Sequence, residues 1–190
     1  GVTYPETQAI YDGGIVNGLT VDNIIAINNL KYAWQFILEE ENIESDYKLL
    51  CELHKITVDK LVLEQDLGRL RTTPVTIGGT SWAPELPQEG IIIEHLELIN
   101  GMSDKLEAAL EMFCFVARTQ MFLDGNKRVA QLMCNKIMME NDIGIFSVPY
   151  DEIDHFKELL VEFYETDNSD KIKDFFRSKC LLLNPSYKTI

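Results

Sequence analysis

Apolar residues recur at intervals of three and four positions along most of the chain, which is the spacing of an α-helix with one buried face. The longest such stripe runs from Ile24 to Leu38. A shorter helix is expected over residues 88–99, directly after Pro87. The helical spacing recurs in these further segments: 49–61, 106–121, 129–137, 153–163 and 172–176. Candidate N-caps precede three of the helices: Thr20, Ser45 and Ser103. The pattern predicts an all-α fold.

The exception is the segment 71–84, with the sequence RTTPVTIGGTSWAP. Threonine, valine and isoleucine residues flank the pair Gly78-Gly79, which predicts a short β-hairpin with its turn at the two glycines. Two short strands cannot form the core of a sheet, so we expect a flap that lies on the helical body. We favour a contact of Trp82, at the end of the flap, with that body over a contact with a bound peptide.

Neither an internal repeat nor a long linker divides the 190 residues, so we expect a single domain. Its parts are an N-terminal helical segment over about 5–60, the flap over 71–84, core helices over 103–140 and C-terminal helices over 150–182. The chain begins without a methionine. We expect Gly1 to be the remnant of a tag, and whether the N-terminus is complete stays open.

The composition excludes several classes of protein. Hydrophobic residues make up 46% of the chain and charged residues 25%, as in an ordinary globular protein. Acidic residues outnumber basic ones by 31 to 17, and the net charge of −14 disfavours nucleic acids and anionic membranes as partners. No apolar run approaches the roughly 18 residues that span a bilayer, and we expect no signal peptide. The four separated cysteines are expected to be reduced thiols in a cytoplasmic protein.

The run QMFLDGNKR at residues 120–128 carries the clearest chemistry. Gly125 supplies a turn, and Asn126 can cap a helix that begins at Lys127. The free amides of that first helical turn attract an anion. Asp124 offers the hard oxygen that Mg²⁺ uses beside phosphates. Two cations add positive charge to the turn: Lys127 and Arg128. The residues predict a Mg²⁺-nucleotide loop, and a solvated turn with a surface charge pair is the alternative.

This run resembles the signature of the Fic/Doc family, His-x-Phe-x-Asp/Glu-Gly-Asn-Gly/Lys-Arg. Five positions match in place: Phe122, Asp124, Gly125, Asn126 and Arg128. The segment 71–84, after Gly68–Arg71, corresponds to the flap of the family, and the helices on either side correspond to its core bundle. The resemblance covers roughly residues 5–180 and implies a Fic-type helical bundle.

The resemblance also implies an activity, which is transfer of AMP from ATP to a Ser, Thr or Tyr hydroxyl of a target protein. Asp124 would hold Mg²⁺. The nucleotide would be bound by Gly125, Asn126, Lys127 and Arg128. The target would pair with the flap at Thr76, Ile77 and Gly78, by strand addition.

One departure concerns the general base, because Gln120 stands where the family has histidine. An amide cannot accept a proton near neutral pH, and the loss of a general base costs about two to four orders of magnitude in rate. The remote histidines His54 and His155 are expected to be structural or at the surface. A second interpretation of Gln120 is a buried amide that hydrogen-bonds across the motif loop.

Three further departures concern the nucleotide and its control. Lys127 replaces a glycine of the common motif, as in the kinase-like Doc branch, and Gln131 replaces a second arginine that would meet the γ-phosphate. The inhibitory helix of many relatives would fall on residues 7–12, where Tyr11 replaces the essential Glu. We therefore expect no self-inhibition of the usual kind, although Asp12 is left open as a substitute.

The leading hypothesis is a bacterial-style Fic-fold protein that binds Mg²⁺ and ATP, or another nucleotide, and docks a protein target on its flap. We expect it to transfer nucleotide to the target poorly, because it lacks a general base. One alternative is an active transferase of altered chemistry that moves a phosphoryl, phosphocholine or other phosphate-containing group. Another is a non-catalytic regulatory binding module. The sequence leaves a homo-oligomer open.

Overall fold

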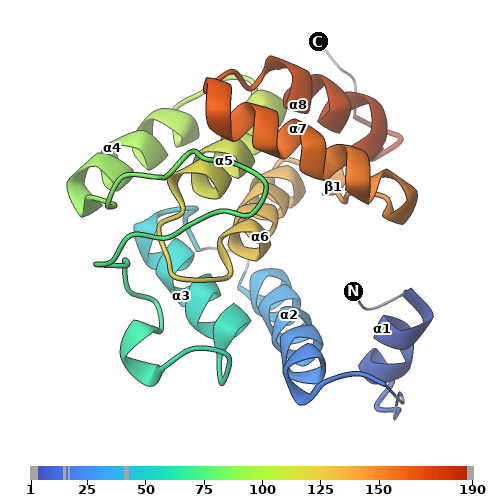
Figure 1. Ribbon diagram of the computed structural model, residues 1–190. Helices are drawn as coiled ribbons and strands as arrows, with labels where there is room; N and C mark the ends of the chain where they lie inside the picture. The colour runs from blue at the N-terminus through green and yellow to red at the C-terminus, as the bar shows by residue number, and fades with distance from the viewer. Residues whose placement is uncertain (1–3, 15, 17, 41–42, 188–190) are drawn as a thin grey trace.

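A computed structural model of the chain describes residues 4–187 except 15, 17, 41 and 42. Its architecture is helical, as the apolar spacing predicts (Figure 1). The α-helices of the described residues are α1 (Tyr4–Tyr11), α2 (Val21–Glu39), α3 (Tyr47–Val58), α4 (Glu89–Asn100), α5 (Lys105–Thr119), α6 (Asn126–Glu140), α7 (Ile153–Thr166) and α8 (Asp170–Phe175). Shorter helical turns are η1 (Glu64–Asp66), η2 (Tyr150–Glu152) and the π-helical η3 (Phe176–Cys180). Of these helices, none is both long and apolar enough to cross a bilayer.

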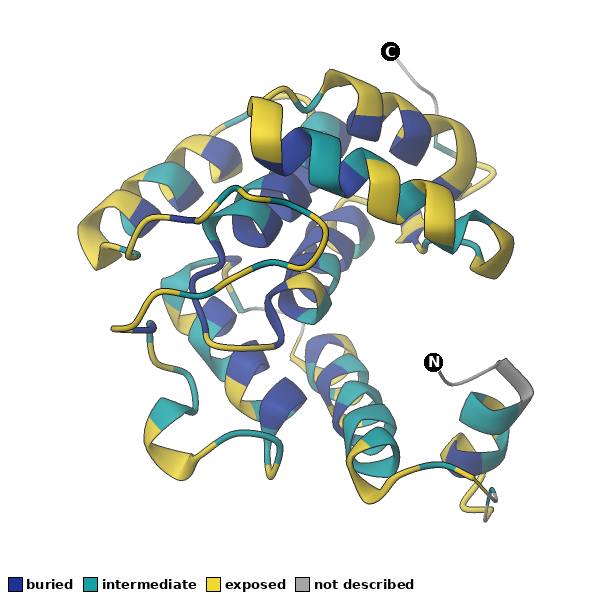
Figure 2. Ribbon diagram, in the orientation of Figure 1, coloured by how far each residue is buried: buried dark blue, intermediate teal, exposed yellow. Residues whose placement is uncertain are grey.

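Helices α5 and α6 form the centre of the fold and make the most extensive helix pair. Both carry buried residues around most of their circumference, which places them inside the bundle rather than on its surface. Helices α2 and α3 pack against α6 on one side, and α7 and α8 lie on the other side of the bundle (Figure 1). Figure 2 shows the buried residues concentrated along this central pair. The connection between α5 and α6, which contains residues 120–125, is therefore anchored at both ends by the core.

The helix starts follow the expected capping chemistry with two shifts of one residue. Thr20 caps α2 through a capping box with Asn23. The caps of α3 and α5 are Asp46 and Asp104, and not the neighbouring serines at 45 and 103. Each aspartate side chain accepts a hydrogen bond from the amide three residues later, and its negative charge also matches the positive end of the helix.

The fold contains one two-stranded antiparallel sheet among the described residues, but it lies outside the flap. Strands β1 (Gly144–Phe146) and β2 (Leu181–Leu183) pair with Ile145 opposite Leu182. Residues 71–84 have the expected turn at Gly78-Gly79 but no strand. The prediction of strands at these positions is wrong, since Pro74 and Pro84 lack amide donors for a ladder. Instead the segment runs as an irregular flap across the front of the bundle (Figure 1).

The last helices are held to the core by an ion network. Lys173 of α8 is buried and bonds Glu107 at 2.7 Å and also Glu111, both on α5. Arg177 adds a second contact to Glu107. Burial opposes ionisation of Glu107, but the hydrogen bonds and charges of Lys173 and Arg177 outweigh it and lower the pKa of this carboxyl. The network fixes the C-terminal helices on α5.

Candidate functional site

The loop between α5 and α6 has two residues in left-handed backbone conformations. Gln120 follows the last residue of α5 with φ 47° and ψ 55°. Gly125 precedes α6 with φ 78°, and a Cβ at this position would lie 2.6 Å from Cγ1 of Val58 on α3. Only glycine combines that backbone with so close an approach. The loop is therefore pressed against α3, as Figure 1 shows.

The Asn126 side chain closes this loop from within. Its carbonyl oxygen accepts from the Phe122 amide at 2.9 Å, and its Nδ2 donates to the Phe122 carbonyl and to Oε1 of Gln120, at 2.8 and 3.1 Å. Helix α6 begins at Asn126, with Gly125 as its N-cap. The prediction that Asn126 caps a helix from Lys127 is therefore wrong, because this side chain is used to shape the loop. Only the backbone of Asn126 remains available to a ligand.

The first turn of α6 presents free amides. The N–H of Val129 donates to the Gly125 carbonyl at 3.0 Å and begins the helical ladder. The N–H groups before it, at residues 126–128, have no acceptor among the described residues. Unpaired amides at the positive end of a helix form a ready anion site.

A cavity of about 920 Å³ opens beside this turn, between α6, α7 and the flap. Lys127 and Gln131 line it from α6, one helical turn apart. The apolar side chains that line it are Ile77, Phe113, Val148, Ile153, Phe156, Leu160 and Val161. Lys127 is exposed, and it has no ion-pair or hydrogen-bond partner among the described side chains. The cavity thus combines apolar walls with two lysines, Lys127 and Lys157, and one acid, Glu158. Among the lining residues Lys127 represents the first turn of α6, whereas Asp124, Asn126 and Arg128 do not line the cavity. Apolar walls with a few polar groups are typical of small-molecule sites.

The other two charged residues of the motif neutralise each other. Arg128 Nη2 donates to Oδ2 of Asp124 at 2.7 Å, and Nη1 donates to the Thr57 carbonyl at 3.3 Å. The Asp124 side chain is 60% exposed and that of Arg128 28%. No group of three or more acidic, cysteine or histidine side chains that could hold a metal occurs in the described part of the chain. Asp124 is thus a single carboxylate that suits an ion arriving with other oxygen ligands.

Gln120 is buried, with 9% exposure, and its side chain is fully engaged. Nε2 donates to the Ala117 carbonyl at 2.6 Å and to the Tyr164 hydroxyl at 3.3 Å, while Oε1 accepts from Asn126. Burial raises the pKa of Tyr164, so its hydroxyl stays protonated at neutral pH. This matches the second interpretation of Gln120, an amide that hydrogen-bonds across the loop.

His54 on α3 is part of the loop's support rather than a substitute base. The Gly68 amide donates to Nδ1 at 2.9 Å, so the ring proton is placed on Nε2, which donates to the Asp124 carbonyl at 3.2 Å. The ring stacks on Phe122 with centroids 3.8 Å apart. Burial lowers the pKa of His54 to about 4. His155 is an exposed residue of α7 beside Glu158. The structural and surface interpretations of these histidines are confirmed.

Arg71 is a site residue that sequence reasoning missed. It is 3% exposed, and its Nε donates to the Gln120 carbonyl at 2.6 Å. Its terminal nitrogens donate to the carbonyls of Thr73, Pro84 and Glu85, at both ends of the flap. No local pattern distinguishes this arginine, since its acceptors are main-chain atoms 2, 13, 14 and 49 positions away.

The flap residues predicted to bind a target divide into two groups. Ile77 is half-buried and, with Gly78, lines the cavity, whereas Thr76 is exposed and does not. Trp82 stacks on Tyr164 with centroids 5.4 Å apart and lies under the Arg118 guanidinium. The expected contact of Trp82 with the helical body is therefore confirmed.

The N-terminal residues considered for self-inhibition lie on and after α1. Tyr11 contacts Lys31 of α2, through its carbonyl and its ring, and Asp12 accepts from Gln8. Neither contact joins α1 to the motif loop.

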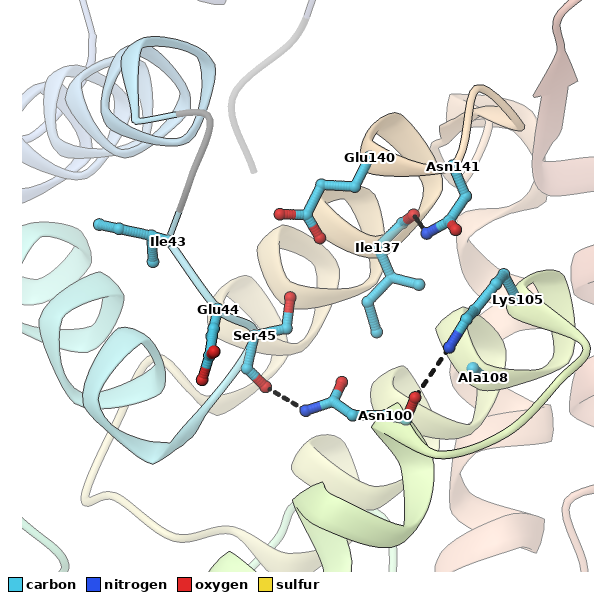
Figure 3. Close-up of a pocket in the computed structure, with 9 residues that line it drawn as sticks. All are labelled: Ile43, Glu44, Ser45, Asn100, Lys105, Ala108, Ile137, Glu140 and Asn141. Atoms are coloured by element: carbon cyan, nitrogen blue, oxygen red, sulfur yellow. Dashed lines mark hydrogen bonds between the residues drawn. The ribbon is translucent and has the colours of Figure 1, made fainter.

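A second pocket, of about 360 Å³, lies at the opposite end of α6 and holds none of the predicted site residues (Figure 3). Lys105 donates to the Asn100 carbonyl there, and Asn100 donates to the Ser45 carbonyl. The buried Ser45 hydroxyl has no partner among the described residues. These contacts join the end of α4 to the start of α5 and to the segment before α3, and they identify no ligand.

Comparison with known proteins places the motif in a wider context. The sequence matches the Fic/DOC family over residues 44–138, which is half of the chain. No curated protein shows significant similarity. Among solved structures, Fic-1 of C. elegans superposes with a TM-score of 0.67 at 22% identity, covering 93% of this chain and 58% of that one.

Two bacterial structures are also similar. A Fic domain containing signaling protein of Bacteroides thetaiotaomicron has a TM-score of 0.69 at 16% identity, covering 84% of this chain and 64% of its own. BepC, a VirB-translocated effector of Bartonella tribocorum solved with bound AMPPNP, has a TM-score of 0.60 at 16% identity, with coverages of 90% and 91%. The chain thus spans 58% and 64% of the first two relatives, and the likeness to all three is one of fold.

Proposed function

The chain belongs to the Fic/DOC family, and on that premise we propose that it binds a Mg²⁺-nucleotide at the start of α6 and docks a protein target on its flap. We further propose that it transfers nucleotide to hydroxyl groups poorly, because its general base is missing. One observation carries the proposal: the first turn of α6 has free amides at residues 126–128, and Lys127 of that same turn, which has no partner among the described side chains, lines a largely apolar cavity.

The first part of the proposal, nucleotide binding, follows because the groups at the start of α6 and in the cavity complement the phosphates and the base of a nucleotide. The phosphates of a nucleotide would accept hydrogen bonds from the first turn of α6 and meet the Lys127 ammonium. Its base would lie against the apolar walls, beside Phe113 and Phe156. The volume of about 920 Å³ is within the range of ligand sites, roughly 300 to 1,000 Å³. The AMPPNP bound to BepC supports a nucleotide as the ligand.

A magnesium ion fits the donor set at Asp124. Mg²⁺ is commonly held by one or two carboxylates together with substrate phosphates, and not by a cage of protein ligands. The exposed carboxylate of Asp124 provides one such ligand, next to the amides that would hold the phosphates. When bound, the ion would neutralise phosphate charge and orient the phosphates for reaction.

The second part of the proposal, poor transfer of nucleotide to hydroxyl groups, follows from the chemistry of Gln120. Its amide cannot accept a proton, and both its donor and its acceptor are used inside the loop. His54 is buried against Phe122 and bonded at both ring nitrogens, so it cannot take over the role. A target hydroxyl would therefore attack without a general base, at a rate lower by about two to four orders of magnitude.

The docking role of the flap is supported by its unpaired backbone. Between residues 74 and 79, no main-chain hydrogen bond joins the flap to another described part of the chain. Free amides and carbonyls in an extended segment can pair with a target strand. Thr76 and Ile77 lie in this segment, and Ile77 also borders the cavity, which brings a docked segment close to the nucleotide.

A second candidate is transfer of a different phosphate-containing group, as in the Doc branch. The observation that favours it is Lys127, whose exposed ammonium borders the cavity in place of the glycine of AMP-transferring members. Mass spectrometry of proteins that co-purify with the chain would distinguish the two, since each group adds a different mass.

Isothermal titration calorimetry with AMPPNP and Mg²⁺ tests the proposal. We expect saturable binding that weakens in Lys127→Gln, whereas His155→Gln, on the exposed face of α7, leaves the affinity unchanged. The absence of heat at high nucleotide concentration would favour a regulatory module whose nucleotide site is vestigial.

A further inference from the structure

The ion pair between Asp124 and Arg128 joins the metal ligand of the proposed function to a second residue that the family resemblance assigns to the nucleotide. Asp124 would hold the metal, and Arg128 would meet a phosphate. In the structure they instead bond each other at 2.7 Å across one turn at the start of α6. Arg128 is also held by the Thr57 carbonyl at 3.3 Å, so its guanidinium is fixed from two sides.

We infer that this pair makes the site specific for the metal–nucleotide complex, and that it rejects the free cation and the metal-free nucleotide. This inference rests on the proposed function and deepens it. It assigns to Asp124 and Arg128 a specificity-determining role in addition to their direct contacts with ligand.

The free cation is disfavoured because it must displace the guanidinium from Asp124. Arg128 would then remain as an unpaired cation one helical turn from a doubly charged ion. Like charges at such distances repel strongly near a protein surface. Since no cluster of further metal-binding side chains exists among the described residues, nothing else compensates for this repulsion.

The metal-free nucleotide is disfavoured for the complementary reason. A phosphate that takes Arg128 from Asp124 leaves an unpaired carboxylate beside the phosphate oxygens. Only the metal–nucleotide complex gives both members of the ion pair a new partner, because its metal pairs with Asp124 while its phosphate pairs with Arg128. Each ligand component therefore raises the affinity for the other, which is a coupling free energy between two adjacent subsites.

Lys127 provides the matched control. It adjoins Arg128 in sequence and carries the same charge, but no ion pair or hydrogen bond joins it to a described side chain. Replacing it with glutamine should weaken both forms of the nucleotide alike and leave their ratio unchanged. Replacing Arg128 with glutamine should change the ratio.

Calorimetry with AMPPNP, in Mg²⁺ and in EDTA, tests the inference. For the wild type we expect binding at least about fivefold tighter with Mg²⁺ than in EDTA, the lower end of typical coupling. In EDTA, Asp124→Ala should bind AMPPNP about fivefold more tightly than the wild type does, because Arg128 is released. That gain should be absent when Asp124→Ala is made in the Arg128→Gln background.

The possible failures can be told apart. If the wild type binds no AMPPNP with Mg²⁺, both the proposed function and this inference are overturned. If the wild type binds the complex but Asp124→Ala and the wild type bind equally in EDTA, Asp124 is a metal ligand only and the inference alone is overturned. A gain that persists in the Arg128→Gln background would assign the effect to the carboxylate alone and likewise overturn the role of the pair.

Discussion

The Arg71 guanidinium donates a 2.6 Å hydrogen bond to the main-chain carbonyl of Gln120, and so joins the base of the flap to the residue that stands where the family signature has histidine. Gln120 ends α5 in a left-handed conformation, and carbonyls at a helix end need partners outside the helix. The same guanidinium bonds the carbonyls of Thr73 and Glu85 at the two ends of the flap. The flap and the motif loop are therefore held by one side chain.

Arg71→Met should destabilise the protein by about 2 to 4 kcal/mol, because it leaves several buried carbonyls without donors. Arg71→Lys should recover only part of this loss, since one ammonium cannot reach acceptors on both sides of the flap. Urea denaturation followed by circular dichroism measures both effects. Arg69→Met is the control, because Arg69 is exposed two positions away. Equal stabilities of the Arg71→Met and Arg69→Met variants would contradict the role of Arg71.

His54 should make stability fall with acidity. Burial lowers its folded pKa to about 4, below the ordinary value of 6.5, so the unfolded chain binds the proton more readily between these values. The contribution is fully present above pH 6.5 and is lost as the pH falls towards 4, by about 3 kcal/mol. Denaturation curves at pH 7, 5.5 and 4 should show this slope in the wild type.

The slope assigned to His54 has a clear control. In His54→Gln this part of the pH dependence should vanish, although the variant is less stable at every pH because the stacking on Phe122 is lost. His155→Gln, at an exposed position, should keep the wild-type slope. An unchanged slope in His54→Gln would show that other groups cause the acid loss.

Gly125→Ala should cost more than its backbone conformation alone. A non-glycine residue at positive φ costs roughly 1 to 2 kcal/mol, and here the new Cβ also meets Val58 at 2.6 Å. Gly13→Ala is the matched control, because Gly13 has φ 81° but open space around its Cβ position. Thermal denaturation of the two variants should give a larger loss for Gly125→Ala. Equal losses would show that the contact with α3 is unimportant.

The helical architecture could be predicted because α5 and α6 repeat their apolar residues over four turns each. The caps were harder to place, since Ser45 and Asp46 are both good cap residues and differ only in where the backbone enters α3. The missing amide donors of Pro74 and Pro84 could have argued against strands in the flap from the sequence. The hydrogen bonds from Arg71 to the carbonyls at the ends of the flap could not be predicted, because they join distant parts of the chain.

The motif was readable from sequence, but its internal hydrogen bonds were not. The Gln120 and Asn126 side-chain amides form a hydrogen bond because the Gln120 backbone is left-handed. The neighbouring residues in the sequence do not predict this conformation. By contrast, the pair of Asp124 and Arg128 has the spacing of four residues at which helical charges meet, and this contact was open to prediction. His54 was expected to be structural, yet its link to the Asp124 carbonyl depends on how α3 packs.

The central claim is that the site binds a Mg²⁺-nucleotide but lacks the group that removes the proton from a target hydroxyl. The most direct test is the transfer of label from ATP, labelled at its α-phosphate, to proteins of a cell lysate by the wild type and by Gln120→His. We predict little labelling by the wild type and an increase of about 100-fold or more in Gln120→His, abolished by adding Asp124→Ala. Wild-type labelling as strong as that of Gln120→His, and lost in Asp124→Ala, would contradict the account.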